Sequence, residues 1–235
     1  MSARVRAQTV RHAQLGIANL KVDVPSHICL FYKDDTELRE RLSFVTAALT
    51  DPEQVAVLFG SKERLEEILG YIAKDQGRDT AADLAAGRVV LVHGAADADA
   101  LLAGIAQALD DAVARGAKLI RFLGFIGWGD LDWPTDEDLM TFEAKVTEAV
   151  KSYPAVVVCT YNVDKLSGPL LIFAGIETHP FTIIETTLAR NPHYVPFAEY
   201  IERRSRSKTQ EERASALRGV TIGPLDRERA ARPAE

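Results

Sequence analysis

The chain has 235 residues, of which 47% are hydrophobic and 26% charged, and its 28 Lys and Arg against 34 Asp and Glu give a formal net charge of −6. This apolar content excludes an intrinsically disordered chain, and no apolar run approaches the roughly 18–20 residues of a membrane span. The pI of about 5.5 argues against a nucleic-acid-binding protein, which usually carries a basic stripe. We expect a globular protein with one substantial core.

The compartment can be predicted from the chain start and the cysteines. No charged region followed by an apolar run opens the sequence, so we predict no signal peptide. Cys29 and Cys159 lie far apart and match neither a disulfide framework nor a CxxC metal motif. We therefore expect a reducing, cytoplasmic location. The basic residues between Arg203 and Lys208 are interpreted as a solvated helix face, in preference to a phosphate-binding patch.

The hydrophobic pattern divides the chain into three parts. Residues 1–22 have weak periodicity and are predicted to form an N-terminal arm. Residues 23–202 are predicted to form one domain, and 203–235 a charged C-terminal helix and tail. In the domain, apolar runs predict six strands, at His27–Tyr32, Val55–Phe59, Arg88–His93, Lys118–Leu123, Ala155–Tyr161 and Phe181–Thr187. Helical periodicity predicts the connections, at Leu38–Leu49, Leu65–Ile72, Thr80–Ala86, Leu101–Val113, Thr135–Val150 and Leu166–Ala174.

Strands that alternate with helices predict a three-layer α/β fold, with a mainly parallel sheet covered by helices on both faces. Ligands of such sheets bind beyond the carboxyl ends of the strands. The turn after the first strand, Phe31–Glu37, is where a phosphate-binding loop would lie. It contains no glycine, and Asp34, Asp35 and Glu37 would repel a polyphosphate. This composition argues against NTP hydrolysis.

Other candidate residues each allow a structural and a functional interpretation. His27 and Cys29 share one strand face, where they either belong to the core or line a site. A metal centre would also need His93, His179 or Cys159, and no short ligand spacing supports one, so no metal is predicted. The Gly-rich loop Gly124–Pro134 carries Trp128, which either walls a pocket or fills the core.

Glu143 lies on the helix that follows this loop, beside Phe142. We interpret it as solvated, and Arg121 is a candidate partner if the carboxylate is buried.

Four segments occur in an order that resembles a known family: His27–Tyr32, Cys159–Asn162, Thr178–Pro180 and Asn191–Pro196. The chain is similar over residues 22–202 to the MEDS family, the sensory domain of methanogens, methylotrophs and the dichloromethane-dehalogenase regulator. The resemblance implies a RecA/KaiC-like domain that has lost its phosphate loop and senses small organic compounds. Phe125 stands where the family often has Gly-Glu, so a ligand-contacting acid is absent there.

The leading hypothesis is a stand-alone prokaryotic signalling sensor without catalytic activity. Family members accompany histidine kinase, anti-sigma-factor or DNA-binding modules, so the resemblance implies relay to such a partner protein. The predicted ligand-binding residues are His27, Cys29, Tyr32, Arg121, Trp128, Tyr161 and His179. The ligand is unknown, and no cofactor is predicted. Two alternatives stay open. One is a RecA-type nucleotide binder or ATPase that uses Lys33 and Thr36. The other is a scaffold whose C-terminal helix docks on a partner or on a second copy.

Overall fold

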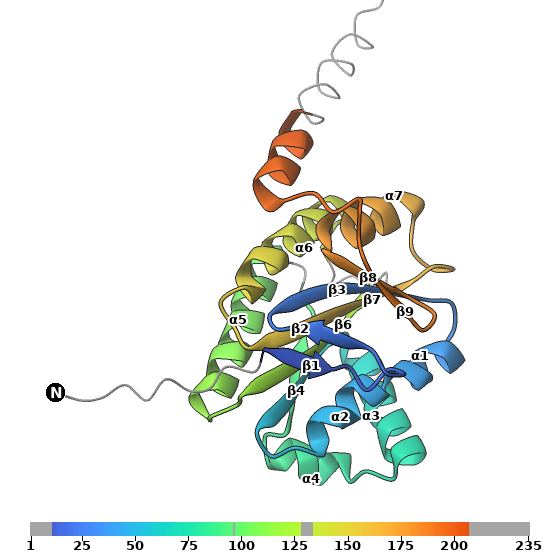
Figure 1. The fold of residues 1–235 in the computed structure, drawn as a ribbon, viewed down its shortest axis with the longest axis vertical. Coiled ribbons are helices and arrows are strands. Elements are labelled where there is room, and N and C mark those ends of the chain that lie inside the picture. The colour runs from blue at the N-terminus through green and yellow to red at the C-terminus, as the bar shows by residue number, and fades with distance from the viewer. Residues whose placement is uncertain (1–10, 96, 128–133, 207–235) are drawn as a thin grey trace, which may run out of the picture. The chain divides into compact units, whose positions relative to one another are not determined.

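The computed structural model describes residues 11–95, 97–127 and 134–206. The chain divides into two compact units, Met1–Phe197 and Ala198–Glu235. The first unit is a three-layer α/β fold, in which a seven-stranded sheet lies between helices (Figure 1). This architecture confirms the predicted fold class.

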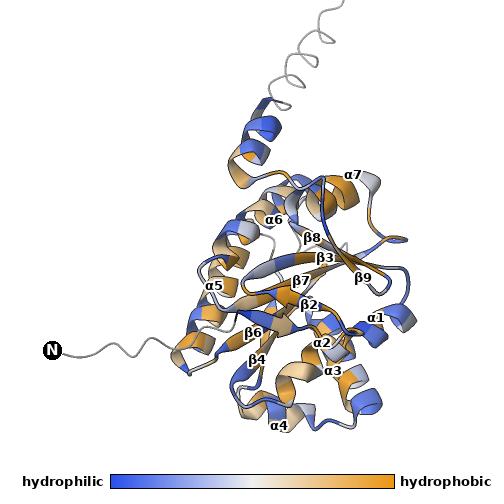
Figure 2. Ribbon diagram, viewed as in Figure 1, coloured by the Kyte–Doolittle hydropathy of each residue, from blue (hydrophilic) through white to orange (hydrophobic). Residues whose placement is uncertain are grey.

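Six strands of the sheet are parallel and the last is antiparallel, in the order β5-β4-β6-β7-β3-β8-β9. Their bounds are β3 Ser26–Tyr32, β4 Gln54–Gly60, β5 Val89–His93, β6 Leu119–Ile126, β7 Ala155–Asn162, β8 Phe181–Ile184 and β9 Thr187–Arg190. Every residue of β6 and β7 is buried, as expected for strands covered on both faces. Figure 2 shows these central strands as predominantly hydrophobic.

The helices cover the two faces of the sheet. One face packs against α2 (Ser43–Leu49), α3 (Lys62–Gln76) and α4 (Thr80–Ala85), with α1 (Asp35–Arg41) beside α2. The opposite face packs against α5 (Ala98–Ala114), α6 (Asp136–Val150) and η1 (Leu171–Ile176), a π-helix that continues from α7 (Gly168–Leu170). Thr135 caps α6, because its side chain accepts a hydrogen bond from the Asp138 N–H.

Three elements differ from the sequence expectation. The helix predicted over Leu38–Leu49 is divided between α1 and α2 at Leu42. Strand β6 continues through Gly124 to Ile126, where we predicted a loop. A Cβ on Gly124 would lie 3.3 Å from the Phe122 ring, so glycine here lets neighbouring side chains approach the strand. The last predicted strand ends early and turns back as the hairpin β8–β9.

The segment predicted as an N-terminal arm contains a hairpin of β1 (His12–Gln14) and β2 (Lys21–Asp23). Leu15 and Ile17 in its turn are buried and belong to the hydrophobic core on the α2 side of the sheet. Arg121 of β6 holds the hairpin in place. Its guanidinium donates to the carbonyl oxygens of Gln14 at 2.7 Å and Leu15 at 3.2 Å, and to Gln54 Oε1 at 2.8 Å.

In the second unit, residues 198–206 are helical. Its basic side chains pair along the helix, Arg203 with Glu199 and Arg206 with Glu202. Across the described part of the chain, no helix combines the length and the apolar character that crossing a membrane requires.

We predict that Arg121→Met lowers the free energy of unfolding by about 2–3 kcal/mol, because buried carbonyl groups lose a charged donor. Urea unfolding measures this loss, and amide hydrogen exchange should show faster exchange in residues 12–23. The control is Arg39→Met, which removes an exposed ion pair with Asp75 and should have a much smaller effect. Equal losses in the two variants would contradict the role given to Arg121.

Candidate functional site

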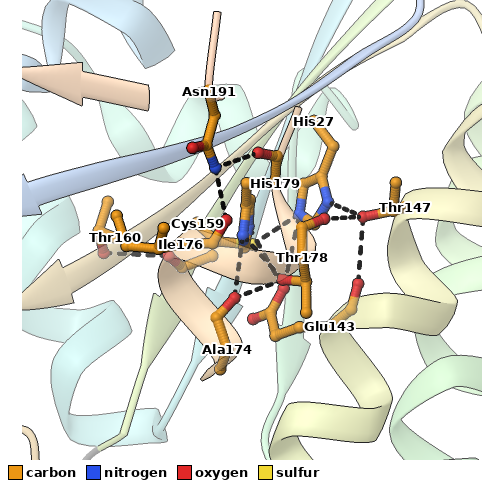
Figure 3. A network of polar contacts seen from close by, with 11 residues as sticks. His27, Glu143, Thr147, Cys159, Thr160, Ala174, Ile176, Thr178, His179 and Asn191 are labelled. Carbon is orange, nitrogen blue, oxygen red and sulfur yellow. Dashed lines mark hydrogen bonds and ion pairs between the residues drawn. The ribbon is translucent and has the colours of Figure 1, made fainter. Parts of the chain in front are cut away.

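A cluster of four buried polar side chains lies between the sheet and α6 (Figure 3). It consists of His27 from β3, Glu143 from α6, Cys159 from β7 and His179, which follows η1. Each side chain is at most 2% exposed. The four come from separate elements, so the tertiary fold assembles the cluster. We call these four residues the buried polar cluster.

Strand register explains why His27 and Cys159 lie close together. Cys29 of β3 pairs with Cys159 of β7, and His27 pairs with Val157. Side chains alternate between faces along a strand, so His27, Cys29 and Cys159 project from the same face. Helix α6 covers this face and contributes Glu143 and, one turn later, Thr147.

The donor atoms of the cluster face a common centre. Glu143 Oε2 lies 3.5 Å from Nε2 of His27 and 3.5 Å from Nε2 of His179. Cys159 Sγ lies 3.2 Å from His27 Nε2, and the donor atoms of the four residues all lie within 4.8 Å of one another. Both Glu143 carboxylate oxygens and His179 Nε2 have no hydrogen-bond partner of normal geometry. Buried polar atoms without partners are costly and call for an explanation.

Thr147 determines which ring nitrogen of His27 carries hydrogen. Its hydroxyl donates to the Thr178 carbonyl oxygen at 2.6 Å and lies 2.7 Å from His27 Nδ1. Because the hydroxyl hydrogen is directed to the carbonyl, the hydroxyl oxygen accepts a hydrogen bond from His27 Nδ1–H. The neutral imidazole then has its lone pair on Nε2, directed at the cluster centre.

The π-helix determines which ring nitrogen of His179 carries hydrogen. Its Nδ1 lies 3.1 Å from the Ala174 carbonyl oxygen, and a carbonyl can only accept, so Nδ1 carries the hydrogen. The Ala174 carbonyl also accepts from the Thr178 hydroxyl. Asn191 donates to the carbonyl oxygens of Ile176 at 2.5 Å and His179 at 2.8 Å. π-Helical turns often occur at functional sites, and this one orients an imidazole.

Burial controls the protonation of the cluster. It lowers the pKa of His179 to about 3. The pKa of His27 is also lowered, first by burial and then by the neighbouring His179. Burial raises the pKa of Glu143 to about 8, against the opposing influence of the Tyr161 hydroxyl and the Cys159 thiol. Both imidazoles are therefore neutral at pH 7.

This chemistry does not favour a cysteine nucleophile. Burial, followed by the Glu143 carboxylate, raises the pKa of Cys159, whereas nucleophilic cysteines have lowered pKa values and partial exposure. The same four groups are all metal ligands. Within the described ranges, they form the one group of three or more such residues.

Four of the seven predicted ligand-binding residues lie at or beside the cluster. His27 and His179 belong to it, with ring centroids 3.9 Å apart. The Tyr161 ring lies edge-on to His179 at 5.8 Å. Cys29 adjoins the cluster on the same strand face as His27.

Two of the other three residues lie elsewhere. Tyr32 and Arg121 project from the opposite face of the sheet, where they join the core on the α2 side and the hairpin contact. Trp128 falls outside the described residues. His93, which we considered as a metal ligand, lies at the end of β5 and is exposed, apart from the cluster.

Glu143, Thr147 and Cys159 were absent from the predicted ligand-binding residues, although Cys159 was considered as a possible metal ligand. The interpretation of Glu143 as solvated is wrong, since its side chain is fully buried, and it faces the two histidines instead of Arg121. The sequence did contain an indication that Glu143 is buried. Glu143 lies four residues after Leu139 and three before Val146, on the apolar face of α6.

A cavity of about 200 Å³ lies on the same side of the sheet, between α5 and α6. Phe122 and Val157 form its floor, and its remaining wall is mostly apolar, with Leu102, Ile105, Ala106, Leu109, Val146, Ala149, Val150, Ser152 and Tyr153. Helix α6 therefore directs Glu143 and Thr147 to the cluster, and Val146, Ala149 and Val150 to the cavity.

We predict that Thr147→Val lowers the free energy of unfolding by about 1–3 kcal/mol, because it leaves two buried polar groups without a partner. Chemical denaturation provides the measurement. Thr141→Val on the same helix is the matched control, since Thr141 is half-buried and bonds a carbonyl of its own helix. A loss no larger than the control's would refute the bridging role of Thr147.

Comparison with known proteins agrees with the family suggested by the sequence. A search of curated proteins found no match. Residues 26–180 match the model of the MEDS family, described as the methanogen/methylotroph, DcmR sensory domain. This segment begins at β3, contains all four residues of the buried polar cluster and spans about two thirds of the chain. The chain therefore belongs to the MEDS family of sensory domains.

Proposed function

We propose that this protein is a signalling sensor that binds a small, mostly apolar organic molecule in the cavity between α5 and α6 and has no catalytic activity. The cavity is the observation that carries the proposal. Small-molecule sites are concave and mainly apolar, with few polar groups. An enclosed apolar cavity of about 150 Å³ holds benzene. The space between α5 and α6 is about 200 Å³ and partly open to solvent, so a compound of benzene size or slightly larger would fit there.

The polar groups at the cavity leave little scope for recognising a charged ligand. Ser152 and Tyr153 line the cavity, and the Tyr153 hydroxyl already bonds the Asp110 carboxylate at 3.0 Å. No charged side chain is among the described lining residues. Shape and apolar contact would therefore select the ligand, which favours an uncharged hydrocarbon or halocarbon.

The geometry of the turn after β3 argues against nucleotide turnover. The Lys33 N–H donates to the Glu37 carboxylate at 2.9 Å, and the Glu37 N–H donates to Asp34 at 3.0 Å. In a phosphate-binding loop, such N–H groups would surround phosphate. Here carboxylates accept hydrogen bonds from these N–H groups. The same carboxylates place negative charge where a triphosphate would lie.

Helix α6 offers a route from ligand to output. A molecule in the cavity would contact Val146 and Ala149, while Glu143 and Thr147 contact the buried polar cluster. A change in the position of α6 would reach both sites. A histidine kinase, an anti-sigma factor or another regulator remains the proposed recipient, and a cytoplasmic location and a second copy of this chain remain predictions.

We predict that a benzene-sized apolar compound at a hundred times its dissociation constant stabilises the protein by about 2.7 kcal/mol. For a chain of this size, this corresponds to a rise in Tm of roughly 5–10 °C, measurable by thermal-shift screening of hydrocarbons and halocarbons. Ala106→Phe should abolish the response by filling the cavity.

The matched control is Ala103→Phe, which adds the same ring at an exposed position of α5 and should leave the response intact. A library that shifts neither the original protein nor the control would refute the proposed ligand class. A response that survives Ala106→Phe would place the ligand elsewhere, including the residues predicted from the sequence.

We predict that MgATP at millimolar concentration produces no binding heat in isothermal titration calorimetry, with the original chain or with Lys33→Ala. Saturable binding that Lys33→Ala weakens would instead support the RecA-type alternative.

A further inference from the structure

We propose that His27, Glu143, Cys159 and His179 together bind one divalent transition-metal ion, zinc being the best match. The inference goes beyond the sensor function and is independent of the cavity. It depends on the orientation of lone pairs, on distances and on charge.

The orientation of lone pairs is the first argument. Hydrogen bonds at Nδ1 leave both histidines with unprotonated Nε2 atoms that face the Glu143 carboxylate. Lone pairs on imidazole and carboxylate repel one another unless a proton or a metal cation lies between them. Metal-binding histidines usually have this arrangement, with the second ring nitrogen bonded to a carbonyl or another acceptor.

For the two imidazole–carboxylate pairs, distance distinguishes a metal ion from a shared proton. A proton that bridges nitrogen and oxygen needs a separation of about 2.7–3.2 Å, whereas both Nε2 atoms lie 3.5 Å from Glu143 Oε2. Zn–N and Zn–O bonds of about 2.0–2.1 Å and Zn–S of 2.3 Å, at tetrahedral angles, separate the ligand atoms by about 3.3–3.6 Å. The widest donor separation, within 4.8 Å, would close with side-chain movements of about 1 Å.

Charge is the third argument. Two neutral imidazoles, a carboxylate and a thiolate carry two negative charges, which a divalent ion neutralises within a buried site. Without metal, protons on Glu143 and Cys159 provide the same neutrality. Binding is thus an exchange of two protons for one M²⁺, with no redox change.

The donor types restrict the metal. Calcium and magnesium prefer sets of oxygen ligands, whereas thiolate with imidazole suits zinc and related transition metals. Four protein ligands complete a tetrahedral shell, as in structural zinc sites. The ion would join β3, β7, α6 and the segment after η1, so we expect it to be incorporated on folding.

The first experiment measures metal content and ligand identity. Protein refolded with zinc and dialysed should contain one zinc per chain by elemental analysis. Cobalt-loaded protein should show a tetrahedral spectrum with a thiolate charge-transfer band. Cys159→Ala should lose this band and at least tenfold in affinity, whereas Cys29→Ala, on the neighbouring strand, should retain both.

A second readout protects the test against misfolded variants. The original chain should melt at a higher temperature with zinc than after refolding with a chelator, and calcium should have no such effect. Glu143→Gln, which keeps the side-chain shape, should bind zinc at least tenfold more weakly.

Less than a tenth of a zinc per chain in the folded original protein would overturn the proposal. Loss of the charge-transfer band in Cys29→Ala with retention in Cys159→Ala would overturn the ligand set. Neither outcome affects ligand binding in the α5–α6 cavity, which has its own test.

Discussion

The burial of Glu143 between two imidazoles is the constraint on which this side of the molecule depends. A carboxylate with no exposure is costly unless it is neutralised or paired. Neighbouring elements are arranged around it: Thr147 and the Thr178 carbonyl orient one histidine, and the Ala174 carbonyl orients the other. Asn191 then ties the backbone of His179 to the π-helix. The result is a polar centre whose partners come from across the chain.

The two faces of the sheet differ in composition. On the α2 side, a continuous apolar core joins the β1–β2 hairpin, and Arg121 serves as a clamp for backbone carbonyls. On the α6 side lie the buried polar cluster and the cavity. Strand alternation produces this division, because neighbouring residues such as Arg121 and Phe122 must face opposite ways. The side chains of the two faces therefore pack against separate sets of helices.

The sequence predicted the parallel sheet well because buried parallel strands are short, continuous apolar runs such as Val156–Val158. It did not reveal the β1–β2 hairpin, whose strands have three residues each and show too little alternation to stand out. His27, Cys159 and His179 were each considered from the sequence. Their convergence depends on strand register and on the packing of η1, which local patterns do not encode. Glu143 was missed because its charge outweighed its position on the apolar face of α6.

The π-helix η1 has a consequence for the evolution of the site. A π-turn contains one residue more than an α-turn, with i→i+5 pairing in place of i→i+4. Deleting one residue between 171 and 176 would restore ordinary helical pairing and rotate the following chain by about 100°. His179 would then leave the centre while all four donor residues persisted in the sequence. A relative with such a deletion would keep the four residues and lack the assembled cluster, so relatives should be compared by the length of this turn as well as by residue identity.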